Sequence, residues 1–172
     1  MLFDERFVEA LLALMEIDTV TPMEGGSATE HERANLAYLA LAESIGMRAV
    51  FTGAGRLPDH PDANIPVMIE RRMASRTDFL ACQPHLELEI GNSAAENTLM
   101  FNFHMDTVSP HLPCGMHNGV LSGRGAVDNK GPGIALLAAL DHVRKQRPAI
   151  FESTRILMVG LELCGLVKNA SA

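Results

Sequence analysis

The sequence contains no tryptophan, a single tyrosine and only 3 cysteines among 172 residues. Three cysteines that lie far apart do not form a disulfide framework, and they indicate a reducing compartment. Basic residues are also scarce: 14 Lys and Arg stand against 21 Asp and Glu, the formal net charge is −7, and no basic run exceeds Arg71-Arg72. Such a chain lacks the basic and aromatic patches that bind nucleic acid or anionic lipid. We therefore expect neither partner, and we expect a cytoplasmic protein.

Long hydrophobic runs are missing as well. No apolar run approaches the roughly 18 residues that cross a bilayer. The apolar stretch near the N-terminus is interrupted by Glu9 and Glu16, unlike the core of a signal peptide. With 47% apolar residues, the composition is instead that of one globular domain, which at this length needs no disulfide or structural metal to bury a core.

Apolar residues recur with helical spacing in three segments. A helix is predicted after Asp4, which is a suitable N-cap residue. A second helix is predicted between a capping box at 29–32 and Gly46, where a left-handed residue would end it. A third helix, rich in Ala and Leu, is predicted over 131–145.

Short segments between these helices have the pattern of strands, at 47–52, 65–69, 85–90, 98–104, 120–122 and 154–161. Segment 85–90 alternates strictly, which predicts one face in solvent. Segment 98–104 is almost continuously apolar, which predicts a strand buried on both faces. Strands that alternate with helices predict an α/β domain whose mixed sheet has helices on both faces.

Two motifs carry polar side chains at positions suited to ligand binding. His104-Met105-Asp106-Thr107 ends the most apolar predicted strand, and α/β sheets bind ligands at that end. His104 and Asp106 point to the same side of an extended chain, so the carboxylate can orient one imidazole nitrogen and leave the other for a metal. On this motif alone, a structural role is favoured over metal binding: His104 would be a hydrogen-bonded histidine at a strand end, beside an aspartate in a turn.

A glycine-rich segment at 123–131 leads into the third predicted helix and contains Asp128, a candidate second ligand. Its glycines lack the spacing of phosphate-binding loops, so nucleotide binding is not expected.

The segments H-M-D-T-V at 104–108 and G-R-G-A-V-D-N-K-G at 123–131 together resemble the paired signatures of the M20 zinc metallopeptidases. This clan includes aminoacylase, carboxypeptidase and tripeptidase-like exopeptidases. Segment 14–22 and the second predicted helix are similar too. The resemblance covers the front part of the family's length. It implies that residues 1–172 are a single partial catalytic domain, zinc-exopeptidase-like and truncated, without the family's lid and dimerisation domain.

The resemblance also implies roles for individual residues. His104 would bind one of two zinc ions, Asp106 would orient His104, and Asp128 would bridge the two metals. A metal-activated water would attack the amide bond of a small peptide or an N-acyl amino acid, with Glu162 as general base. The bond between Asp128 and Asn129 would be a cis peptide bond.

The resemblance is incomplete where further ligands are needed. Leu163 occupies a zinc-ligand position, leucine cannot bind zinc, and the remaining ligands would lie beyond Ala172. His104 and Asp128 alone are fewer than the three or four protein ligands that zinc normally takes. We therefore expect weak, single or absent zinc binding and background turnover. The alternative function is a non-catalytic remnant or interaction module that self-associates through an uncovered sheet edge.

Two further ligand candidates lie outside these motifs. His111, Cys114 and His117 are spaced as three possible metal ligands, although ordinary surface-loop side chains are favoured there. Cys164 is a lesser alternative as a soft ligand in place of Leu163.

Overall fold

The computed structural model describes residues 4–55 and 65–160. The described helices are α1 (Glu5–Glu16), α2 (Ala28–Ser44), α3 (Val67–Ser75), α4 (Lys130–Gln146) and α5 (Ala149–Ser153), with a short 3₁₀ helix at Pro22–Glu24. The described strands are β1 (Arg48–Gly53), β2 (His85–Gly91), β3 (Asn97–Phe103), β4 (Gly115–His117), β5 (Val120–Ser122) and β6 (Thr154–Gly160). No helix in these ranges is long and apolar enough to cross a membrane.

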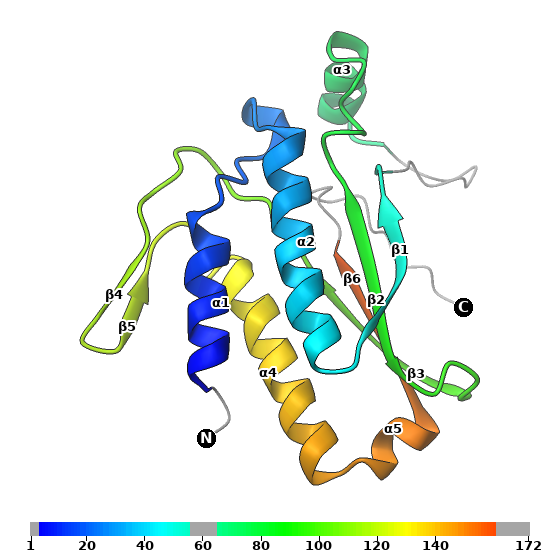
Figure 1. Ribbon diagram of the computed structural model, residues 1–172. Helices are drawn as coiled ribbons and strands as arrows, with labels where there is room; N and C mark the ends of the chain where they lie inside the picture. Colours follow the sequence, from blue (N-terminus) through cyan, green and yellow to red (C-terminus); the bar gives the residue numbers. More distant parts are fainter. Residues whose placement is uncertain (1–3, 56–64, 161–172) are drawn as a thin grey trace.

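Four of these strands form the main sheet, in the order β1-β2-β6-β3 (Figure 1). The pairs β1/β2 and β2/β6 are antiparallel, whereas β3 and β6 are parallel. The remaining strands, β4 and β5, form a separate hairpin. The predicted α/β class with a mixed sheet is therefore confirmed.

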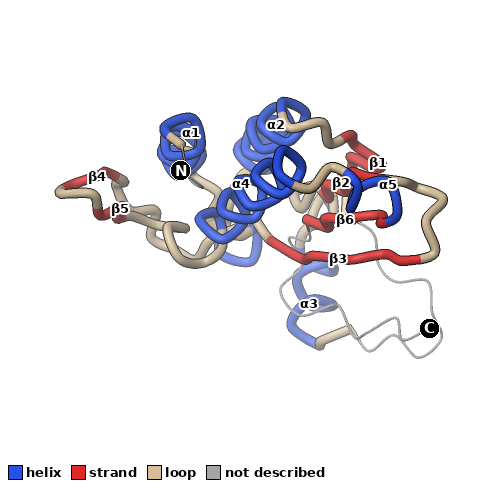
Figure 2. Tube along the Cα trace, turned by 90° about the horizontal axis from the view of Figure 1, so that it is seen from below, coloured by secondary structure: helices blue, strands red, loops and turns tan. Residues whose placement is uncertain are grey.

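One face of the sheet is covered by α2 and α4, and α1 packs beside both helices (Figure 2). The core lies between these layers, where Leu86 and Leu88 of β2 and Met158 of β6 meet Ile134 and Leu137 of α4. These helices supply one of the two helical layers that the sequence predicts. Helix α3 lies beyond the end of the sheet, where a small separate apolar cluster forms around its buried residue Ile69.

The helix boundaries differ from the sequence prediction at the start of α2. The N-cap is Ser27 rather than a capping box at 29–32, because His31 N already donates to Ser27 O at 3.2 Å and closes the first turn earlier. Asp4 is the N-cap residue of α1 as predicted, although its side chain makes no capping hydrogen bond. Gly46 follows the end of α2 with φ +86°, the left-handed conformation that glycine adopts readily.

The prediction of a strand at 65–69 is wrong, because this segment enters α3. Pro66 is the N-cap residue, its fixed φ suits a helix start, and Ile69 turns inward against Phe79. The apolar residues of this short segment were consistent with either structure, and tertiary contact decided between them.

The strand at 85–90 is confirmed, but its predicted wet face is wrong. β2 lies inside the sheet, and even Glu89 is only 2% exposed. Arg48 and Arg155 from the two neighbouring strands hold the Glu89 carboxylate, the latter at 2.8 Å. Cross-strand ion pairing therefore replaces solvent on this face.

The strand at 98–104 is also confirmed, and its predicted burial on both faces is wrong. Within the described residues β3 is an edge strand paired only with β6. Leu99 is 48% exposed and Met100 61%, and burial is complete only at Phe103. An apolar run predicts a strand, but the neighbours that cover it are set by the rest of the fold.

Candidate metal centre

The predicted motifs meet where β3 ends and α4 begins. Phe103, the last residue of β3, is buried and stacks on Tyr38 of α2 with ring centroids 4.6 Å apart. His104 is the next residue after Phe103, so this packing fixes its backbone position. Asp128 lies two residues before Lys130, the first residue of α4, and the peptide bond from Asp128 to Asn129 is cis, as the resemblance implied.

The imidazole of His104 lies between two carboxylates. Its Nε2 is 3.1 Å from Oδ1 of Asp128, and its Nδ1 is 3.0 Å from Oδ1 of Asp106. The three side chains differ in exposure: 11% for Asp106, 33% for His104 and 83% for Asp128. Asp106 is thus the sheltered partner on one ring nitrogen, and Asp128 is the solvent-facing partner on the other.

This environment favours the protonated imidazole. The hydrogen bond with the Asp106 carboxylate, opposed by partial burial and reinforced by the charges of Asp106 and Asp128, raises the pKa of His104 to about 9. The protonated ring donates from Nε2 to Asp128 Oδ1 at 3.1 Å, and from Nδ1 to Asp106, whose backbone O lies at 3.1 Å and whose Oδ1 lies at 3.0 Å. Metal binding at Nε2 requires the neutral ring, so it must compete with a proton there.

The segment after α1 fixes the backbone around Asp106. Thr19 Oγ1 donates to Met105 O at 2.6 Å, and Thr107 N donates to Thr19 O at 2.8 Å. Thr21 N in turn donates to Thr107 O at 2.8 Å. Sequence reasoning did not identify these threonines, because the pairing joins residues almost ninety positions apart.

The loop that carries Asp128 is closed by backbone contacts. Gly131 N donates to Gly125 O at 3.1 Å, and a Cβ on Gly131 would lie 1.9 Å from Ala126 O. Glycine is needed at 131 because the backbone of the loop passes this close.

The donor types fit a zinc site, but the donor number does not complete one. An imidazole beside one carboxylate, with a second carboxylate on its other nitrogen, is a common arrangement around zinc. Across 4–55 and 65–160, however, no group of three or more His, Cys, Asp or Glu side chains could hold a metal ion. His104 and Asp128 can therefore supply two ligands of a larger set.

Glu162, Leu163 and Cys164 lie outside the described residues.

The His111, Cys114 and His117 side chains, all described, form no metal-binding group. Cys114 packs against the core with Sγ 3.7 Å from Leu12 O, and His111 Nδ1 lies 3.9 Å from Asp18 Oδ1.

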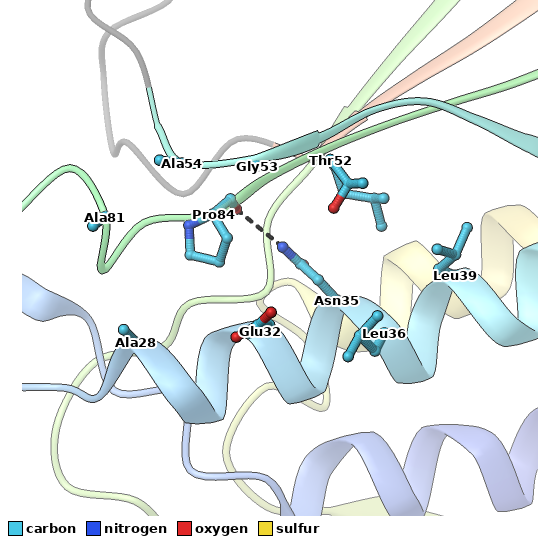
Figure 3. Close-up of a pocket in the computed structure, with 11 residues that line it drawn as sticks. Ala28, Glu32, Asn35, Leu36, Leu39, Thr52, Gly53, Ala54, Ala81 and Pro84 are labelled. Carbon is cyan, nitrogen blue, oxygen red and sulfur yellow. Dashed lines mark hydrogen bonds between the residues drawn. The ribbon is translucent and has the colours of Figure 1, made fainter.

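A small pocket lies away from the donor pair, between α2 and the ends of β1 and β2 (Figure 3). Its volume is about 190 Å³, and its lining includes Glu32, Leu36, Leu39 and Thr52. Asn35 Nδ2 closes one side by donating to Pro84 O at 3.0 Å. A pocket of this size is below that of small-molecule sites, and it holds none of the predicted site residues.

Solved structures with a similar fold include several peptidases. Human carnosine dipeptidase 1 superposes with a TM-score of 0.60 at 20% identity, over 92% of this chain and 32% of that chain. An M20 family metallo-carboxypeptidase from Sulfolobus solfataricus gives 0.59 at 18% identity, over 93% and 31%. The dipeptidase Dug1p from Saccharomyces cerevisiae gives 0.60 at 13% identity, over 91% and 31%. The chain thus spans about a third of the length of these proteins, and at such identities the likeness establishes the fold.

A family profile adds evidence from the sequence. The profile of peptidase family M20/M25/M40 matches residues 100–162, a range that contains both motifs. No curated protein sequence matches the chain. The profile match over residues 100–162 and the similar fold both agree with the resemblance to the M20 metallopeptidases.

Proposed function

We propose that this chain is a partial catalytic domain, spanning residues 1–172, of a metal-dependent hydrolase that cleaves amide bonds in small peptides or N-acyl amino acids. The observation that supports this function best is the imidazole of His104 held between Asp106 and Asp128 at 3.0 and 3.1 Å. The M20 profile match over the same residues supports it independently.

Each residue of this group has a distinct proposed role. His104 Nε2 and Asp128 would hold zinc, and Asp106 would keep the ring oriented through Nδ1. When bound, zinc supplies an activated water and polarises the scissile carbonyl. Glu162, which follows the end of β6, is the proposed general base that accepts the proton of that water.

Two ligands seldom hold zinc tightly. We therefore expect at most one weakly held zinc ion for this chain, and turnover at the background rate.

Zinc titration of dialysed protein, with elemental analysis and a zinc- or cobalt-supplemented assay on dipeptides and N-acyl amino acids, tests this proposal. His104→Ala should abolish the zinc response, whereas His142→Ala, an exposed histidine on α4, should leave it unchanged. Equal zinc binding by wild type and His104→Ala would contradict the proposed ligand. Two tightly held zinc ions with real turnover would contradict the ligand count.

The exposed edge of the sheet supports a second candidate, a self-associating interaction module. β3 presents Leu99 and Met100 at 48% and 61% exposure along an edge with unpaired backbone groups in the described structure. Exposed apolar edge strands pair with other chains. Light scattering should then show a dimer or larger species that Met100→Lys shifts toward monomer, and a monodisperse wild-type monomer would contradict this candidate.

A further inference from the structure

Lys130, the first residue of α4, is a buried cation that the proposed chemistry does not use. It is 1% exposed, and its Nζ donates to Leu14 O at 3.0 Å and to Ile17 O at 2.9 Å. Both carbonyls belong to the end of α1, whose last turn has no basic residue of its own. The ammonium therefore donates to Ile17 O and adds a second donor to Leu14 O, which already accepts from Ile17 N at 3.3 Å. It lies at the negative end of the helix dipole.

The position of Lys130 in its own element is unfavourable, which calls for a compensating role. A cation at a helix N-terminus faces the positive end of the dipole. Burying an ammonium is costly unless it is well paired. A lysine within α1 could cap the same carbonyls from the surface, so capping alone does not explain a lysine that reaches across from α4.

Lys130 is also part of the loop that carries Asp128. Only Asn129 separates the two residues in the sequence. The loop packs against the aliphatic part of the Lys130 side chain: a Cβ on Gly125 would lie 2.8 Å from Lys130 Cδ. Anchoring the ammonium therefore also places the loop backbone.

The segment whose carbonyls accept hydrogen bonds from Lys130 also contacts the backbone next to His104, the other residue of the donor pair. Thr19 lies two residues after Ile17, and it makes hydrogen bonds to Met105 and Thr107, the residues on either side of Asp106. One short segment, 14–21, thus contacts both the backbone on either side of Asp106 and the ammonium of Lys130, which follows the Asp128 loop.

We propose that Lys130 is a positioning residue that holds Asp128 against His104 by anchoring the start of α4 to the last turn of α1. The inference rests on the proposed function for the use of this pair as metal ligands. The placement itself is measurable without any metal.

Amide hydrogen exchange and imidazole NMR on the full chain test the placement. In Lys130→Met, exchange at the Gly131 amide should accelerate about tenfold or more, because the loop loses a charge-assisted anchor. The Nε2–H signal of His104, which its contact with Asp128 at 3.1 Å protects, should be lost in Lys130→Met, as it should be in Asp128→Ala, which removes the acceptor. Lys145→Met, on the same helix but 55% exposed, should retain both properties.

A purely structural role would accelerate exchange in β2 and β6 to the same extent and would leave the His104 signal unchanged. Wild-type exchange at Gly131 together with a retained His104 signal in Lys130→Met would overturn the proposal.

Should Lys130→Met fail to fold, the wild-type chain provides the measurement. In low denaturant, the amides of Ile17 and Gly131 should open in one step if the lysine couples the two segments. Separate openings overturn the proposal. Zinc binding by wild type that His104→Ala leaves unchanged counts against the proposed function and leaves the exchange result standing.

Discussion

Asp141 of α4 links two helices through a buried carboxylate, and its substitution should destabilise the fold measurably. The residue is 3% exposed, and it accepts hydrogen bonds from Arg6 Nη2 at 2.7 Å, Lys145 Nζ at 2.6 Å and Arg144 Nη2 at 3.3 Å. Arg6 lies on α1, so the carboxylate joins α1 to α4. Asp141→Asn keeps the shape of the side chain and removes its charge.

The size of the effect follows from the exposure of the partners. Arg6, Arg144 and Lys145 are 38%, 41% and 55% exposed, so water screens them and rehydrates them when Asp141 is neutralised. Breaking a fully buried ion pair costs about 3–5 kcal/mol, and this half-exposed network should cost less, about 2 kcal/mol. For a domain of this length, that loss lowers Tm by about 4–8 °C.

The pH dependence has a defined sign. Burial raises the pKa of Asp141, but the hydrogen bonds from Lys145, Arg6 and Arg144 outweigh it and hold that pKa below its usual value. A lowered folded-state pKa gives stability that is present above the unfolded pKa of about 3.9 and is lost as pH falls through the folded value. The difference between wild type and Asp141→Asn should therefore be full at pH 7 and shrink below about pH 4.

Urea denaturation at pH 7 and pH 3 measures this difference. Asp4→Asn is the matched control, because Asp4 is 50% exposed and lies 3.6 Å from the same Arg6; it should change the free energy of unfolding by less than about 0.5 kcal/mol. A difference for Asp141→Asn below about 0.5 kcal/mol at pH 7, or one that persists unchanged at pH 3, would refute the reasoning.

Two further predictions concern the packing around α4. Tyr38→Phe removes the buried hydroxyl that donates to Gly133 O at 2.8 Å, and it should lower the free energy of unfolding by about 1 kcal/mol in a urea titration. Because burial raises the pKa of Tyr38, only wild type should lose this stability as pH rises above about 10. An identical alkaline transition in both proteins would disprove the prediction. Gly131→Ala should destabilise the fold by about 2 kcal/mol or more, since its Cβ would lie 1.9 Å from Ala126 O. Gly115→Ala is the control, because a Cβ at that position would have no atom within 4 Å. Equal unfolding midpoints for the two variants would contradict the argument.

Local sequence pattern was sufficient wherever the determinant of structure is itself local. The periodicity behind α1 and α4 predicted both helices within a few residues. The strands predicted at 85–90 and 154–161 correspond equally well to β2 and β6. Such elements depend on side-chain spacing that a single segment contains. The order of the two signature motifs likewise pointed to the M20 family without any tertiary information.

Burial, by contrast, was decided by which segments became neighbours. The acidic face of β2 reads as solvent-exposed until Arg48 and Arg155 are placed on either side of Glu89. The apolar run of β3 reads as doubly covered until its position at the sheet edge is known. Neither fact is contained in the segment, because solvent exposure is a property of the assembled layers.

The candidate centre divides in the same way. The sequence alone determined that His104 and Asp106 share one side of an extended segment, because side chains alternate along a strand. Only the tertiary structure placed Asp128 at 3.1 Å from His104, and only it brought Lys130 onto the carbonyls of Leu14 and Ile17. Such contacts join residues that are distant in sequence, so the packing of α1, α4 and the end of β3 decides them, and no local pattern records it.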